Sequence, residues 1–116
     1  MECQELFLRL GDDEVVVVDC RSEEDWAAFQ FQIPGALRMS VSEMREWAHV
    51  LPDDELIVLC GTASDGADAR EAYWVLQMQG LEPVCLDGGL RRWIRAGLPT
   101  ERCTSLPYST DLLASS

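Results

Sequence analysis

The sequence predicts an α/β domain built on a mainly parallel sheet of about five strands, with helices on both faces. Two continuous apolar runs, at residues 15–18 and 56–60, are typical of strands buried on both sides, as the central strands of a parallel sheet are. A helical pattern over residues 67–79 follows the second run. Strands that alternate with helices in this way indicate an α/β fold.

The remaining helices and strands are predicted from residues that are typical of their ends. We expect further helices over residues 2–10, 23–30, 42–50 and 90–96, and further strands over 36–39 and 83–86. Ser22, followed by three acidic residues, is a typical helix N-cap, and Ser42 has the same place before the next helix. Gly97 follows the last helix at a position where glycine commonly ends one.

The chain is strongly acidic. Nine Arg, no Lys and 21 acidic residues give its 116 residues a net charge of −12. This charge argues against nucleic acids and anionic membranes as partners, because a protein binds either of them through a cationic face. We expect one domain over residues 1–100, a polar tail over 101–116 and a monomer. The acidic start lacks the features of a signal peptide, so we expect a cytoplasmic protein.

Five cysteines are spread along the chain without any Cys-x-x-Cys pair: Cys3, Cys20, Cys60, Cys85 and Cys103. Their spacing predicts neither a metal site nor a cofactor, and an odd number without an export signal favours a reducing compartment. Cys20 and Cys85 lie inside apolar runs and are interpreted as small buried hydrophobic residues.

Cys60 differs because it ends a strand, precedes a loop of small residues and is followed by the longest helix. The loop consists of Gly61, Thr62, Ala63, Ser64, Asp65 and Gly66. Such a loop can turn backbone N–H groups and a helix N-terminus toward the sulfur, which would lower the pKa of the thiol and make it nucleophilic. The alternative is a small hydrophobic residue at a strand end, and the spacing alone leaves both open.

Other residues near this strand edge have two interpretations each. Asp19 and Arg21 either shape the site or form a structural ion pair, which we favour. Arg70 either offers a cation to an anionic substrate or pairs with a neighbouring acid. The hydroxyls of Thr62 and Ser64 could donate to a bound sulfur group or face water. His49, the one histidine, is expected on a helix surface, so the backbone rather than a base would activate Cys60.

Several segments, in order, resemble the rhodanese family of sulfurtransferase domains. They are Asp19-Cys20-Arg21 after the first strand, Ile33-Pro34-Gly35-Ala36, the strand ending at Cys60, and Leu86-Asp87-Gly88-Gly89 followed by Trp93 and Ala96-Gly97-Leu98-Pro99. The resemblance covers about residues 2–100 and implies a three-layer rhodanese-like fold. It also implies that Cys60 takes sulfane sulfur from a donor as a persulfide and passes it to a thiol or protein acceptor.

The sequence departs from the family pattern at the loop, which is longer than usual and carries Asp65 and then Asp68 before its first cation, Arg70. Acids near a thiolate oppose its ionisation and repel thiosulfate, so we expect weak use of that donor. This leaves a non-catalytic module that binds a protein partner as the alternative function. Phosphoryl chemistry on the same scaffold would need an Arg where Gly66 stands, so the sequence disfavours it.

Overall fold

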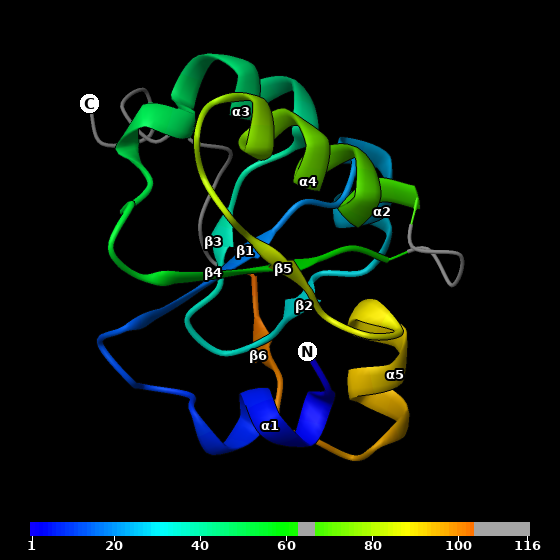
Figure 1. The fold of residues 1–116 in the computed structure, drawn as a ribbon. Helices are drawn as coiled ribbons and strands as arrows, with labels where there is room; N and C mark the ends of the chain where they lie inside the picture. The colour runs from blue at the N-terminus through cyan, green and yellow to red at the C-terminus, as the bar shows by residue number, and fades with distance from the viewer. Residues whose placement is uncertain (63–66, 104–116) are drawn as a thin grey trace, which may run out of the picture.

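The computed structural model describes residues 1–62 and 67–103, and its centre is a four-stranded parallel sheet (Figure 1). The strands are β1 (Val15–Asp19), β3 (Leu37–Arg38), β4 (Leu56–Cys60) and β5 (Val84–Cys85), in the spatial order β3-β1-β4-β5. The two apolar runs are therefore the two central strands, and they pair along their whole length, from Val15 opposite Leu56 to Asp19 opposite Cys60. The described residues place four strands in this sheet rather than the expected five or so.

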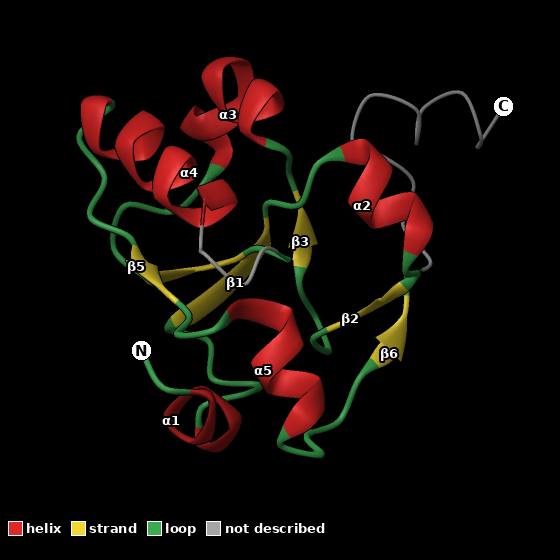
Figure 2. Ribbon diagram, turned by 90° about the vertical axis from the view of Figure 1, so that its right-hand side faces the viewer, coloured by secondary structure: helices red, strands yellow, loops and turns green. Residues whose placement is uncertain are grey.

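Helices cover both faces of the sheet, as predicted (Figure 2). The helices α3 (Val41–Trp47) and α4 (Ala67–Met78) pack on one face, and α1 (Cys3–Leu8) and α5 (Gly89–Arg95) pack on the other. Each face has its own core, because side chains along a strand alternate between the two faces. Val18 and Leu59 belong to the core under α3 and α4, whereas Val17 and Val58 belong to the core with Leu6 and Trp93.

The helix caps agree with the sequence in one case and differ in another. Ser22 caps α2 (Glu23–Ala28), where its hydroxyl accepts a hydrogen bond from the Asp25 N–H at 3.2 Å. The prediction that Ser42 caps the next helix is wrong: Ser40 caps α3 and forms a capping box with Glu43. A short 3₁₀ segment, Ala48–Val50, extends α3. The Ser-x-x-Glu spacing of Ser40 and Glu43 was the signal for this cap.

A two-stranded antiparallel sheet, which the sequence pattern did not predict, joins β2 (Phe31–Gln32) to β6 (Glu101–Arg102). The Cys103 N–H extends the pairing, donating to the Gln30 carbonyl at 2.7 Å. Residues 101–103, assigned above to the tail, therefore pack on the folded part of the chain. Residues 104–116, the rest of that tail, lie outside the described residues. No helix in residues 1–62 and 67–103 combines the length and apolarity needed to cross a bilayer.

Candidate functional site

Cys60 is the last residue of the central strand β4, at the edge where all four parallel strands end. In α/β sheets this carboxyl edge is where ligands bind. The Cys60 side chain lies on the face covered by α1 and α5, in the core that contains Val58 and Trp93. Only 3% of the residue is exposed. Cys60 is thus at the predicted place in the fold, with its sulfur closed off from solvent in this conformation.

The surroundings of Cys60 hold its thiol in the protonated form. Burial is the main cause that raises the pKa of Cys60 well above its ordinary value, and the Asp19 carboxylate adds to the effect. The Arg21 guanidinium acts in the opposite direction. The predicted lowering of the Cys60 pKa by backbone donors is therefore wrong for this conformation, because desolvation of the thiolate outweighs the neighbouring charge.

The first residue of the loop after Cys60 is packed so closely that only glycine fits there without a shift of its neighbours. A side chain at Gly61 would crowd the start of α4, with an added Cβ 3.1 Å from the Asp68 Cβ and 3.3 Å from the Ala69 nitrogen. The Gly61 carbonyl accepts from the Leu90 N–H at 2.9 Å, so α5 anchors the same residue. The Thr62 hydroxyl is buried without a hydrogen-bond partner among the described residues. Four predicted loop residues, Ala63, Ser64, Asp65 and Gly66, lie outside the described residues.

Arg70 lies on an exposed position of α4, and its charge acts on a different cysteine. It lowers the pKa of Cys85, whose thiol donates to the Ala69 carbonyl at 3.6 Å, although burial leaves that pKa raised. Among the charged groups that act most on Cys60 are Asp19 and Arg21. The cation that lowers the pKa of Cys60 is therefore Arg21, just after β1, rather than Arg70 of α4.

Asp19 and Arg21 form a buried ion pair at that end of β1. The Arg21 Nη2 lies 2.7 Å from the Asp19 Oδ2, and the Nε donates to both carboxylate oxygens at 3.0 and 3.1 Å. The remaining donors of Arg21 reach the Phe29 carbonyl at 2.7 Å, the Phe31 carbonyl at 3.2 Å and the Cys103 sulfur at 3.6 Å. This pair thus holds the segment before β2 and the residue after β6 against the sheet edge.

Three residues lie in one row across the sheet at this edge. The register places Arg38 of β3 opposite Asp19 of β1, and Asp19 opposite Cys60 of β4. Residues paired across parallel strands point to the same face. The row therefore brings a second guanidinium, a carboxylate and the Cys60 thiol to one side of the sheet.

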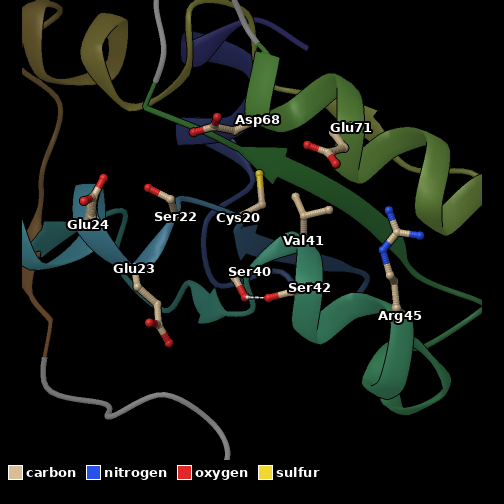
Figure 3. Close-up of a pocket in the computed structure, with 10 residues that line it drawn as sticks. All are labelled: Cys20, Ser22, Glu23, Glu24, Ser40, Val41, Ser42, Arg45, Asp68 and Glu71. Carbon is tan, nitrogen blue, oxygen red and sulfur yellow. Dashed lines mark hydrogen bonds between the residues drawn. The ribbon is translucent and has the colours of Figure 1, made fainter.

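A pocket of about 540 Å³ opens at the same edge, on the side of α2, α3 and α4 (Figure 3). Four of its ten lining residues are acidic: Glu23 and Glu24 on α2, and Asp68 and Glu71 on α4. Figure 3 shows the Cys20 sulfur pointing toward α4 between these groups. Burial is the main cause that raises the pKa of Cys20, and Asp19 and Asp68 raise it further. The cysteine that faces the pocket is therefore Cys20, and its environment keeps it a neutral thiol.

Cys20, Arg38 and Cys103 also belong to this edge, although they were not predicted as site residues. Cys20 was assigned to an apolar run, yet it follows Asp19, the last residue of a strand, and that position was a usable signal. Arg38 and Cys103 gave no local signal, because strand register and a pairing between distant segments bring them here. In residues 1–62 and 67–103, no three side chains of His, Cys, Asp or Glu gather as metal ligands would.

Known proteins share both the sequence pattern and the fold. The chain is 32% identical over 97 residues to an HTH-type transcriptional regulator of Mycobacterium tuberculosis, which covers 84% of this chain but only 42% of that protein. The fold of this chain is similar to that of a thiosulfate sulfurtransferase from Pseudomonas aeruginosa, with a TM-score of 0.74 and 30% sequence identity. The match covers 92% of this chain and 20% of the other. A rhodanese-related protein from Thermoplasma volcanium has a TM-score of 0.73 at 22% identity, covering 87% and 95% of the two chains.

The sequence establishes the family, because the sequence profile of the rhodanese-like domain family matches residues 2–96. This match spans both central strands, the buried Asp19–Arg21 pair, Cys60 and the turn before α5. It ends before β6, so the pairing of β6 with β2 is outside it. The chain belongs to the rhodanese-like domain family.

Proposed function

We propose that this protein is a sulfur carrier or sulfurtransferase that holds sulfane sulfur as a persulfide on Cys60. The observation that carries the proposal is the place of Cys60 at the carboxyl end of the central parallel strand, directly before a glycine packed against the start of α4. The buried Thr62 hydroxyl, without a partner among the described residues, supplies a polar group two residues from the sulfur.

The reaction has two balanced displacement steps at sulfur. In the first, the site opens to the donor, the Cys60 sulfur attacks the outer, zero-valent sulfur of the donor, and the thiol proton passes to the departing donor group. A new S–S bond forms, and the donor leaves with the electron pair of the bond that breaks. In the second, an acceptor thiolate attacks the outer sulfur of the persulfide, and Cys60 leaves as a thiolate that takes up a proton.

The charge around the site favours a carrier over a fast enzyme for small anions. The chain carries a net charge of −12, and Asp19 opposes ionisation of Cys60. Such a field slows the approach of a dianion such as thiosulfate to the Cys60 thiol. We therefore expect a protein persulfide or a low-molecular-weight persulfide as donor and a cellular or protein thiol as acceptor. The named activity of the Pseudomonas aeruginosa relative supports sulfur transfer as the reaction class.

Intact-mass spectrometry of the full chain after incubation with a sulfane donor tests this proposal. The wild-type protein should gain the mass of one sulfur atom, and Cys60→Ser should not. Cys3→Ser is the matched control, because Cys3 is a buried thiol in the same core as Cys60 and does not hydrogen-bond to it. Gain of sulfur by Cys60→Ser, or loss of the gain in Cys3→Ser, would contradict the assignment to Cys60.

A non-catalytic module that regulates or binds a protein partner is the second candidate. The burial and raised pKa of Cys60 favour it, since a closed, protonated thiol is a poor nucleophile. The relative named as a transcriptional regulator supports it as well. This function predicts that no sulfane donor loads Cys60 even after prolonged incubation, whereas a carrier loads slowly but to completion.

A further inference from the structure

Arg38 carries a buried guanidinium that meets no carboxylate among the described residues. The residue is 2% exposed and stands at the end of β3. Its Nη1 reaches the Asp19 carbonyl at a long 3.5 Å, while its Nε and Nη2 are buried without a hydrogen-bond partner. A buried charge without a partner is strongly destabilising, so an arrangement of this kind needs an explanation.

The comparison with Arg21 shows what is missing. Arg21 uses its Nε and Nη2, the two donors along one edge of the guanidinium, to hold both oxygens of the Asp19 carboxylate. Arg38 has the same two donors vacant. This edge matches two oxygens of a carboxylate, sulfonate or phosphate in parallel hydrogen bonds. Asp19 does not serve both arginines, because each of its carboxylate oxygens already accepts two hydrogen bonds from Arg21.

Trp26 of α2 adds a third vacant donor. The Arg38 Cζ lies 5.5 Å from the centre of the Trp26 ring, at a distance where the cation is attracted to the aromatic face. The indole Nε1 of Trp26 is also buried and has no hydrogen-bond partner in the described part of the chain. Three donor nitrogens without a partner thus lie on two neighbouring groups, one of which is positively charged.

We propose that Arg38 and Trp26 form a binding site for a small oxyanion. The pairing of charges beside Arg38 supports this: Asp19 and Arg21 pair with each other, and no carboxylate among the described residues pairs with Arg38. Two oxygens of the ligand accept from the Nε and Nη2 of Arg38, and the indole N–H of Trp26 donates to the same group. Sulfate, thiosulfate and a carboxylate share this chemistry.

Access to the site comes through α2. None of the residues of this six-residue helix is buried, and the bond from Arg21 to the carbonyl of Phe29, the C-cap, ties its C-terminal end. Helices with few buried contacts open at low free-energy cost. Because Trp26 lies on α2, outward movement of the helix uncovers the vacant edge of Arg38, and the bound oxyanion then holds the helix in place.

Oxyanion binding at Arg38 does not depend on sulfur transfer by Cys60, since it is an equilibrium between the free and the bound protein. If Cys60 does carry sulfane sulfur, the oxyanion site lies in the same row of the sheet, with Asp19 between Arg38 and Cys60. Failure of persulfide formation would leave the binding site intact, and failure of binding would leave the persulfide intact. The two proposals can therefore be separated.

The test is a titration of the full chain with sodium sulfate, thiosulfate and acetate at constant ionic strength, followed through the indole N–H signals in ¹H–¹⁵N spectra. Four tryptophans give four signals, and Trp26→Phe assigns the one that matters. The Trp26 signal should shift in a saturable way. The Trp93 signal is an internal control, because its Nε1 already donates to the Pro99 carbonyl at 2.7 Å. The three anions distinguish a tetrahedral from a planar preference.

Two variants and one control decide the location. Arg38→Lys keeps the charge but removes the paired donors, and it should weaken binding at least about tenfold. Trp26→Phe keeps a ring beside Arg38 and removes one donor, and calorimetry should show binding several-fold weaker. The triple variant Arg91→Gln, Arg92→Gln, Arg95→Gln removes the exposed arginines around the pocket beside α5 and should bind as the wild type does.

Three results would overturn the proposal: no saturable shift of the Trp26 signal with any of the three anions, unchanged affinity in Arg38→Lys, or loss of binding in the triple variant. If Arg38→Lys does not fold, Trp26→Phe decides alone, and full-strength binding by that variant counts against the site.

Discussion

The thiol of Cys20 donates to the carbonyl of Cys60 across the two central strands, with an Sγ–O distance of 3.3 Å. The Cys20 backbone N–H donates to the same oxygen at 3.0 Å. This carbonyl thus accepts two hydrogen bonds from one residue, at the point where β4 ends and the candidate loop begins. Cys20 therefore helps to fix the backbone position of Cys60.

We predict that Cys20→Ala lowers the free energy of unfolding by about 1–2 kcal/mol, through loss of a buried hydrogen bond and of packed volume. Urea denaturation measures this change. Cys20→Ser keeps a donor of similar size and should recover part of the loss. Equal stability of the alanine variant and the wild type would show that the thiol contributes nothing to this strand junction.

Removal of Arg21 tests the ion pair that joins the sheet edge to β2 and β6. Arg21→Leu leaves the Asp19 carboxylate buried without a partner, and we expect a loss of about 3–5 kcal/mol in the free energy of unfolding. The double variant Asp19→Asn, Arg21→Leu removes the buried charge as well and should be more stable than Arg21→Leu alone. A double variant that is the less stable of the two would contradict a dominant ion-pair effect.

Gly89 packs against the start of the candidate loop in a conformation that other residues avoid. Its φ is +59°, and an added Cβ would overlap the Gly61 carbonyl oxygen. We expect Gly89→Ala to cost about 1–3 kcal/mol or more in the free energy of unfolding. Gly80→Ala is the matched control, since its φ of +87° is also strained but nothing lies within 4 Å of its added Cβ. The smaller loss of stability expected for Gly80→Ala measures the backbone strain alone.

Stability should fall as the pH rises above neutrality. Thiols in the unfolded chain ionise near about pH 8.5, whereas burial raises the pKa of Cys20 and Cys60 in the folded chain. Above that pH the folded state therefore binds more protons than the unfolded state, and each suppressed thiol lowers stability by up to about 1.4 kcal/mol per pH unit. Below about pH 7.5 both states are protonated, and these two thiols give no slope.

Unfolding experiments between pH 7 and 10 check this prediction. The Cys20→Ala variant should lose less stability over the range than the wild type, because one of the suppressed thiols is gone. A wild-type stability that is flat across this range would mean that the cysteines ionise as easily in the folded chain as in the unfolded one.

The sequence predicted the parts of the fold that depend on local patterns. The β-branched run that forms β1, the apolar run that forms β4 and the capped helix after Ser22 all lie where they were expected. The β2–β6 sheet could not be predicted, since each strand has two residues and the pairing joins segments about seventy positions apart. A strand of two residues has no periodicity to detect.

The candidate site was predicted in part for the same reason. The place of Cys60 follows from the end of a recognisable strand, whereas its burial depends on α1 and α5 covering that face, which no local pattern reveals. The vacant donors of Arg38 depend on the register that pairs Asp19 with Arg38 and on which arginine holds the carboxylate. Such competition between distant side chains is a tertiary property.

Peptide mapping of the loaded protein tests the central claim, that Cys60 carries the sulfur, most directly. The full chain is incubated with a sulfane donor, blocked with an alkylating reagent under denaturing conditions and digested without reductant. The account predicts one added sulfur on the peptide that contains Cys60, and alkylated cysteines without added sulfur at Cys3, Cys20, Cys85 and Cys103. Added sulfur spread over all five cysteines, or absent from the Cys60 peptide, would contradict it.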